Sequence, residues 1–182
     1  KYIHLSSSSI AFILWYYGKD VVLPFILIFA ILFPILDYLR RYILLLNKVY
    51  SNLFWIVTRP SELQGLSGAS WVFLGAGITT YLFSENTVVV ALLIMSLSDS
   101  AAALIGIKYG ITNLFNKSLE GSLAFFITTF LIIYILSSAS PMLTIITTIA
   151  ATSIELFSTP KINDNILIPI ATALILTIGG AR

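Results

Sequence analysis

Long apolar segments recur along almost the whole chain, and they restrict its possible folds more than any other feature. Reading apolar runs between polar breaks gives seven candidate membrane helices in the 182 residues. They are residues 3–17, 21–36, 66–83, 87–107, 119–136, 141–157 and 166–179. A membrane-spanning helix needs about 20 mainly apolar residues, so these segments leave little room for a soluble domain. We therefore expect an all-α, polytopic membrane protein with about seven transmembrane helices, forming a single domain over residues 1–182.

The composition supports a membrane environment. Hydrophobic residues make up 58% of the chain and charged residues 10%, and the mean hydropathy is +0.99. A domain of this size leaves much of its surface exposed, so one small core cannot hide all these apolar side chains. The net charge of +2 is too small to neutralise a nucleic-acid backbone. Because the chain has no cysteine, disulfides, thiolate metal ligands and a cysteine nucleophile are excluded.

The longest interval between apolar segments, residues 37–64, has a different character. It mixes basic and apolar side chains, which is typical of a helix lying along the membrane surface. The alternative is an eighth span, but Asn47, Lys48, Ser51 and Asn52 interrupt the apolar run. We therefore expect an interfacial amphipathic helix between the second and third spans, ended by Pro60.

The charged residues favour one orientation in the membrane. With the N-terminus in the cytoplasm and alternating spans, eight of the ten Lys and Arg residues fall on the cytoplasmic side. Such an excess is typical of cytoplasmic loops. Six of the eight acidic residues fall on the same side, namely Asp37, Glu62, Asp99, Glu120, Glu155 and Asp164. Charges of both signs gathered at one face predict a polar site there.

Asp99 is the most informative of these residues, because it lies within the fourth apolar segment. An ionised carboxylate within a membrane costs about 2.5–3.5 kcal/mol on insertion scales, so such residues usually face a cavity and are functional. The structural alternative is a polar contact with Ser96, Ser98 or a neighbouring helix. The same argument applies less strongly to Glu155, which lies near the end of the sixth segment.

The connection between the fourth and fifth segments contains a candidate anion site. Ser118 is expected to cap the fifth helix, whose free backbone N–H groups and dipole would attract an anion, with Lys117 beside them. Gly106 and Gly110 allow close approach of a phosphate, although their spacing also suits helix packing. The pattern is not a Walker motif, because Asn116 stands where a glycine is needed.

Oxygen ligands for a metal ion are also present. Asp164 and Asn165 follow the sixth segment near Glu155, and hard oxygen ligands suit Mg²⁺; the alternative is a capped turn that starts the last helix. Glu62 is either a ligand or a solvated loop acid. A histidine-based metal site is excluded, because His4 is the only histidine.

The CTP-binding signature of the dolichol kinase, phytol kinase and CTP-dependent diacylglycerol kinase family is similar to part of this sequence. The resemblance lies in Asp99-x-x-Ala102-x-x-x-Gly106-x-x-x-Gly110, followed by Lys117-Ser118-x-Glu120-Gly121. It extends to the Lys1 and His4 opening, to Arg59-x-x-Glu62, and to Glu155 with Asp164-Asn165. Nearly the whole chain is covered, and the central pattern is fairly specific.

The resemblance implies a lipid kinase that moves the γ-phosphoryl group of CTP to a membrane alcohol at the cytoplasmic face, with Mg²⁺. Catalytic roles would fall to Asp99, Lys117, Glu155 and Asp164, and the three carboxylates among them would also bind the metal. Nucleotide binding would fall to Ala102, Gly106, Gly110, Lys117, Ser118, Glu120 and Gly121. Supporting roles would fall to Lys1, His4, Glu62 and Asn165.

Several alternatives stay open. The stretch after Gly110 is shorter than in dolichol kinases, and Asn116 replaces the first of their paired lysines, so the acceptor could be dolichol, a smaller isoprenoid such as phytol, or a diacylglycerol-like alcohol. A CDP-lipid synthase would also use CTP, but its paired acidic signature with adjacent glycines is not seen. A transporter is disfavoured, because the acids crowd one face and no inverted repeat is visible.

Overall fold

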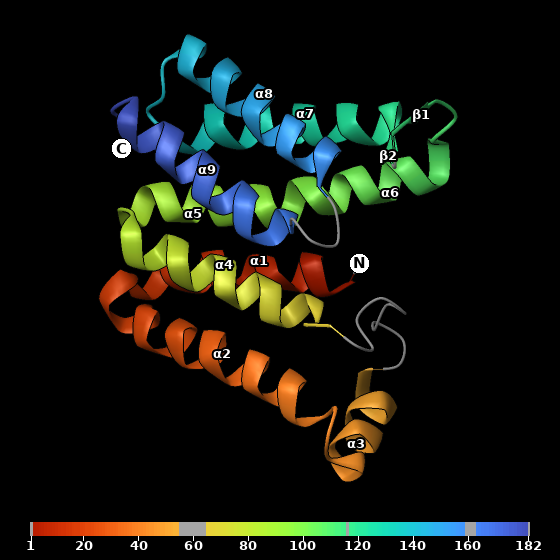
Figure 1. Cartoon of the computed structure of the whole chain (residues 1–182). Helices are drawn as coiled ribbons and strands as arrows, with labels where there is room; N and C mark the ends of the chain where they lie inside the picture. Colours follow the sequence, from red (N-terminus) through yellow and green to blue (C-terminus); the bar gives the residue numbers. More distant parts are fainter. Residues whose placement is uncertain (1, 55–64, 116, 159–162, 182) are drawn as a thin grey trace.

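The computed structural model describes residues 2–54, 65–115, 117–158 and 163–181, with only the backbone described for residues 2–4, 51, 53 and 54. Helices account for nearly all of these residues (Figure 1). The α-helices are α1 Tyr2–Tyr17, α2 Lys19–Leu39, α3 Leu44–Phe54, α4 Gly68–Leu82, α5 Glu85–Leu93, α6 Asp99–Tyr109, α7 Leu119–Leu136, α8 Pro141–Phe157 and α9 Asp164–Ile178. A π-helical turn, Ile94–Ser98, joins α5 to α6 as one continuous rod. The short antiparallel strands β1 Asn113–Leu114 and β2 Lys117–Ser118 form a hairpin before α7.

The long helices lie side by side in stacked layers (Figure 1). α2 packs on α4, α4 packs on α9, and α7 packs on both α6 and α8. α1 packs on α5, and α8 also packs on α9. The hairpin and the start of α1 lie at one end of the bundle, where α3 also lies, whereas the C-terminal end of α9 lies at the other (Figure 1).

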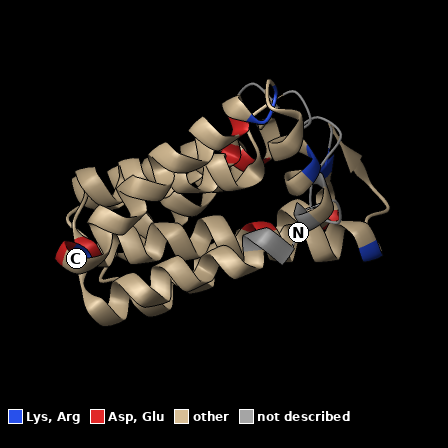
Figure 2. Ribbon diagram, turned by 90° about the horizontal axis from the view of Figure 1, so that it is seen from below, with Lys and Arg blue, Asp and Glu red and all other residues tan. Residues whose placement is uncertain are grey.

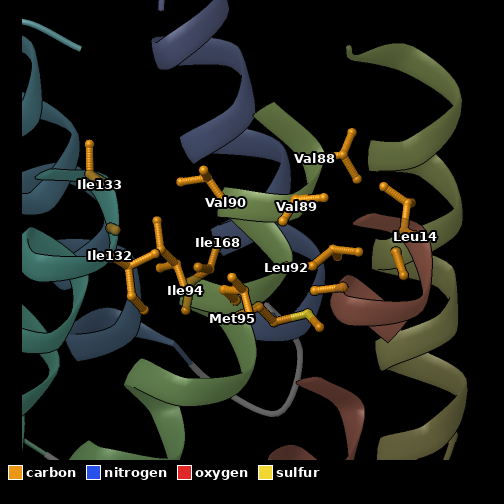
Figure 3. Close-up of a cluster of buried hydrophobic side chains, with 14 of the residues drawn as sticks. Leu14, Val88, Val89, Val90, Leu92, Ile94, Met95, Ile132, Ile133 and Ile168 are labelled. Atoms are coloured by element: carbon orange, nitrogen blue, oxygen red, sulfur yellow. The ribbon is translucent and has the colours of Figure 1, made fainter. Parts of the chain in front are cut away.

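The core of the bundle surrounds the rod formed by α5 and the π-helical turn. Every side chain from residue 88 to residue 95 is buried. Figure 3 shows Leu14 of α1, Ile132 and Ile133 of α7, and Ile168 of α9 arranged around this run. A helix that is apolar on all sides is covered either by a protein core or by lipid, and here neighbouring helices cover this run.

The outer helices carry large apolar side chains on their exposed surfaces. Large apolar side chains such as Phe25 and Ile31 of α2, Ile135 of α7 and Met142 of α8 are exposed. An exposed apolar surface of this extent is suited to lipid rather than water. Among the described residues, three helical stretches are long and apolar enough to cross a membrane, namely Lys19–Leu39, Glu85–Tyr109 and Leu119–Leu136, while α8 and α9 are shorter apolar helices.

The all-helical fold predicted from the sequence is confirmed, and each of the seven apolar segments lies on a helix. The count of seven membrane crossings stays a prediction. The expectation that a surface segment begins at residue 37 is wrong. Asp37 lies within α2 and is buried, because its carboxylate is bound at the start of α4. α3 occupies part of the predicted interval, and Pro60 lies outside the described residues.

Candidate active site

A cleft of about 600 Å³ opens at the end of the bundle that carries the hairpin. It lies where α6 ends, α7 begins, α8 ends and α9 begins, so four helices and the hairpin contribute to its walls. The lining residues are Asp99, Ala102, Ala103, Gly106, Ile107, Gly110, Asn113, Phe115, Lys117, Ser118, Gly121, Ser122, Glu155 and Asp164. Most of the described charged residues lie on the part of the ribbon at this end of the bundle (Figure 2).

Lys117 is the centre of an ion-pair cluster in the cleft. Its Nζ atom lies 2.6 Å from Oε1 of Glu155 and 3.8 Å from Oδ2 of Asp164. Ser122 donates a hydrogen bond to the second oxygen of Glu155 at 3.3 Å, and Ser158 donates to Asp164 at 3.1 Å. The Glu155 side chain is 2% exposed, but that of Lys117 is 28% exposed. The lysine can therefore exchange partners with a ligand that enters the cleft.

Asp99 enters the cleft from α6, directly after the π-helical turn. The residues around it are polar: Ser100 donates to the carbonyl of Ser96 at 2.7 Å, and Thr129 of α7 donates to Ser98 at 2.9 Å. π-Helical turns frequently occur at functional sites. Here the turn separates the fully buried run of the rod from the part that lines the cleft.

The hairpin fixes Lys117 and Ser118 at the start of α7. Asn113 pairs with Ser118 and Leu114 with Lys117. The predicted helix cap is confirmed, since the Ser118 hydroxyl accepts a hydrogen bond from the N–H of Gly121 at 3.1 Å. The N–H of Leu119 donates to the carbonyl of Thr112 at 2.9 Å. The prediction of free N–H groups is therefore wrong for Leu119 and Gly121, because the cap and the hairpin already satisfy them.

Two glycines of the predicted signature permit close packing of α6 on α7. A Cβ atom on Gly121 would lie 2.9 Å from the carbonyl oxygen of Ala102, and one on Gly106 would lie 2.8 Å from the hydroxyl oxygen of Ser118. Ordinary side chains do not fit at such distances. These glycines line the cleft and allow its walls to pack closely. The packing role considered for Gly106 applies, and a role in phosphate binding stays a prediction.

The predicted site residues fall into three groups: those that line the cleft, those that are described but do not line it, and those outside the described residues. Asp99, Lys117, Glu155, Asp164, Ala102, Gly106, Gly110, Ser118 and Gly121 line one cleft. Glu120 does not line it, because its carboxylate accepts a hydrogen bond from the Thr112 N–H at 3.1 Å. Asn165 is buried at the start of α9, where its backbone and side-chain nitrogens donate to Asn163. Lys1, Glu62 and the side chain of His4 lie outside the described residues.

The cleft also contains polar and aromatic residues that the sequence did not single out. Asn113 and Phe115 of the hairpin and Ser122 of α7 contribute to its lining. Ser122 directly follows Gly121 of the predicted signature, so the sequence could have indicated that it lies near the site. Asn113 and Phe115 resemble ordinary loop residues, and only the hairpin brings them to the cleft.

A second buried ion pair lies at the same end of the bundle, outside the cleft. Asp37 lies 3.0 Å from Nε of Arg40, and both side chains are at most 4% exposed. The Asp37 carboxylate also accepts hydrogen bonds from the Ser67 N–H and the Ser70 hydroxyl. The guanidinium of Arg40 lies over the ring of Tyr50. This cluster joins α2, α3 and the start of α4.

Comparison with known proteins places the chain in a family. No protein-family model and no solved structure matches it. The uncharacterized protein RP860 of Rickettsia prowazekii is 36% identical over 152 residues, which cover 79% of this chain and 74% of that protein. The chain belongs to the same family as the rickettsial protein. The uncharacterized protein MJ1137 of Methanocaldococcus jannaschii is 29% identical over 92% of this chain and 85% of its own length.

The homologues also include proteins whose names state a function. CTP-dependent diacylglycerol kinase 1 of Saccharomyces cerevisiae is 36% identical over 132 residues, which cover 69% of this chain. The same match covers 45% of the yeast kinase, so this chain corresponds to less than half of it. The distant homologues thus support relationship to CTP-dependent lipid kinases.

Proposed function

We propose that this chain is a membrane-embedded, CTP-dependent lipid kinase that transfers the γ-phosphoryl group of CTP to the hydroxyl of a membrane alcohol. The observation that carries the proposal is the cleft, into which a lysine and three carboxylates from separate elements converge. The names of the yeast relatives supply the reaction class and the nucleotide.

The geometry of the cleft suits the requirements of phosphoryl transfer. This reaction depends mainly on positioning and on neutralising phosphate charge, with little covalent chemistry for the protein to perform. Lys117 supplies a positive charge at the N-terminus of α7, where the helix dipole also favours an anion. The Ser118 hydroxyl accepts one hydrogen bond in the protein and keeps its own O–H available to donate to a phosphate oxygen.

The carboxylates in the cleft call for a cation in addition to Lys117. Asp99, Glu155 and Asp164 with one lysine give the lining a formal charge of −3 + 1 = −2, which by itself repels a triphosphate. In the described parts of the chain, no three acidic or histidine side chains gather closely enough to hold a metal ion alone. Mg²⁺ usually takes only one or two carboxylates and shares the substrate's phosphates and several waters, so the donor set fits.

We therefore propose that Mg²⁺ would be held by one or two of the carboxylates of Asp99, Glu155 and Asp164, together with phosphate oxygens and waters. Mg²⁺ held there would neutralise the charge of the phosphates. Lys117 pairs with two of these carboxylates, Glu155 and Asp164. We expect its ammonium group to turn from Glu155 and Asp164 toward the phosphates when a nucleotide enters.

The position of the cleft fits a reaction between a soluble donor and a membrane-dissolved acceptor. The cleft lies at the end of a bundle whose sides are apolar, so an alcohol can approach sideways from the bilayer past Ile107, which lines the cleft and is exposed. Among the described basic residues, five lie at this end (Arg40, Arg41, Lys48, Lys108 and Lys117) and Lys19 lies at the other. The positive-inside rule then puts the cleft on the cytoplasmic side.

The test is transfer by the purified protein in detergent or proteoliposomes. CTP labelled at the γ-phosphate is incubated with Mg²⁺ and separately with diacylglycerol, phytol, geranylgeraniol and dolichol. Label entering one of these lipids supports the kinase. In a parallel reaction, CTP labelled in its cytidine is incubated with a lipid phosphate such as phosphatidate. Cytidine label retained on the lipid would instead identify a CDP-lipid synthase, and solute flux without any lipid product would identify a transporter; either result overturns the proposal.

A further inference from the structure

The hairpin brings two side chains into the cleft that the phosphate and metal chemistry does not use. Asn113 stands at the start of β1, and Phe115 stands at the turn between the strands. Both line the cleft. One offers an amide with donor and acceptor groups, and the other offers a flat aromatic face. This pairing of groups is the combination that proteins use to hold a nucleobase, through hydrogen bonds to its edge and stacking on its face.

Phe115 is held in an unusual position. Its φ is 56°, and it is the one residue other than glycine with positive φ in the described ranges. The side chain is 69% exposed, and its ring touches the Phe157 ring of α8 at a centroid distance of 5.2 Å. A large apolar side chain held at a turn, supported on one edge by a second ring, keeps a ring face available to a ligand.

The strand pairing explains why this position suits the base of a bound nucleotide. Asn113 pairs with Ser118, and Leu114 pairs with Lys117. Ser118, which is assigned to the triphosphate, is therefore the cross-strand neighbour of Asn113, and Phe115 follows on the same strand-to-strand connection. In a nucleoside triphosphate the ribose joins base and phosphates over a short distance, so their binding groups must also be neighbours.

We infer that Asn113 and Phe115 form the nucleobase subsite of this cleft, with the Phe115 ring stacked on the pyrimidine of CTP and the Asn113 amide hydrogen-bonded to its polar edge. This inference rests on the proposed function and assigns the residues that recognise its nucleotide. The competing occupant of Phe115 is the hydrocarbon chain of the lipid acceptor. We favour the base, because the neighbouring amide of Asn113 offers nothing to a hydrocarbon.

Four variants separate the two occupants: Phe115→Ala, Phe115→Leu, Phe115→Trp and Asn113→Leu. Leucine keeps the apolar character of residue 115 without an aromatic face, whereas tryptophan keeps the face. Ile111→Ala is the matched control, because Ile111 lies on the same connection, is 88% exposed and does not line the cleft. Each variant is assayed with CTP varied at saturating lipid, and with lipid varied at saturating CTP.

For a nucleobase subsite, the KM for CTP rises about tenfold or more in Phe115→Ala and Phe115→Leu, in line with the usual strength of base stacking. It returns toward the original value in Phe115→Trp. Asn113→Leu raises it about threefold to tenfold, as for loss of a hydrogen bond. The KM for lipid stays unchanged throughout. If the KM for lipid instead rises in Phe115→Ala and returns toward the original value in Phe115→Leu, the inference is overturned in favour of a lipid-chain subsite.

A binding measurement keeps this inference distinct from the proposed function. Equilibrium dialysis with labelled CTP and Mg²⁺, without lipid, is repeated with inorganic triphosphate as competitor. We expect Phe115→Ala to weaken CTP binding and to leave the affinity for inorganic triphosphate unchanged. Equal weakening of both ligands, or of neither, overturns the subsite while transfer by the original protein still supports the kinase. Absence of both CTP binding and transfer in the original protein overturns the proposed function itself.

Discussion

Two clusters at the same end of the bundle combine an acidic residue, a basic residue and serine hydroxyls beside the start of a helix, yet they differ in access. In the Asp37–Arg40 pair both side chains are at most 4% exposed, and the carboxylate is bound by the Ser67 N–H and the Ser70 hydroxyl as well. In the second cluster, Lys117 and Asp164 are 28% and 23% exposed and line a cleft.

The comparison separates a structural role from a chemical one. A buried ion pair whose hydrogen bonds are provided by the protein has no capacity left for a ligand, and it holds the ends of α2, α3 and α4 together. The Lys117 cluster keeps two carboxylates and one lysine at the wall of a cavity that Asp99 also lines. Residue type is similar in the two clusters, and accessibility decides which of them can bind a substrate.

The largest effect on activity is expected in the cleft, from Asp99→Asn. This change keeps the shape of the side chain and removes its charge, so metal binding or orientation of the hydroxyl is lost. We expect the transfer rate to fall by about 10²–10⁴-fold, with the protein still folded in detergent by size-exclusion chromatography. Asp20→Asn, at the opposite end of the bundle, is the control and should retain full activity. Undiminished transfer by the Asp99 variant would remove this residue from the site.

Lys117→Met is expected to have a smaller effect on activity and an additional effect on stability. Activity should fall on the order of 10²-fold or more, because a charge that neutralises phosphate is lost. Stability should also fall, since Glu155 stays buried without its 2.6 Å partner, a change that costs about 3–5 kcal/mol in fully buried pairs and less here because Lys117 is partly exposed.

The double variant Lys117→Met with Glu155→Gln resolves these two effects. It removes the unpaired buried charge, so thermal stability in detergent should recover while activity stays lost. Recovery of activity together with stability would mean that the lysine acts only on the fold, and the contrast between the two clusters would then fail.

The smallest effect on activity is expected in the buried Asp37–Arg40 cluster, from Arg40→Met. Asp37 then stays buried without its cation, and the free energy of unfolding should fall by about 3–5 kcal/mol. The turnover per folded molecule should stay unchanged, as measured by activity normalised to folded protein after gel filtration. Arg41→Met, next in the chain and exposed, should alter neither quantity. A large loss of turnover in the Arg40 variant would show that this cluster also takes part in the reaction.

Much of the fold could be predicted from hydropathy alone. Each of the seven apolar segments lies on a helix, because a long apolar run has few other ways to satisfy its backbone in lipid. Asp37 illustrates the limit of this approach. From the sequence it was counted as a surface charge. In the structure it is bound by Ser67 and Ser70, 30 and 33 residues away in sequence, and local sequence patterns carry no information on such distant partners.

For the candidate site, the charged residues could be predicted better than the uncharged residues of the hairpin. Asp99, Lys117, Glu155 and Asp164 were expected at one face, and they line one cleft, although spacing did not reveal that Lys117 would pair with Glu155, 38 residues away. Asn113 and Phe115 gave no signal, because their placement depends on a turn of positive φ. The anion site at α7 was overestimated, because the hairpin carbonyl of Thr112 already binds one of its N–H groups.

The π-helical turn at Ile94–Ser98 makes the site sensitive to spacing as well as to residue type. Successive residues of a helix are rotated by about 100°, so a single deletion between Met95 and Asp99 would swing the carboxylate away from the cleft without altering any residue that lines it. Substitutions in this turn should therefore be tolerated far more readily than insertions or deletions. In this stretch, the number of residues matters as much as their chemistry.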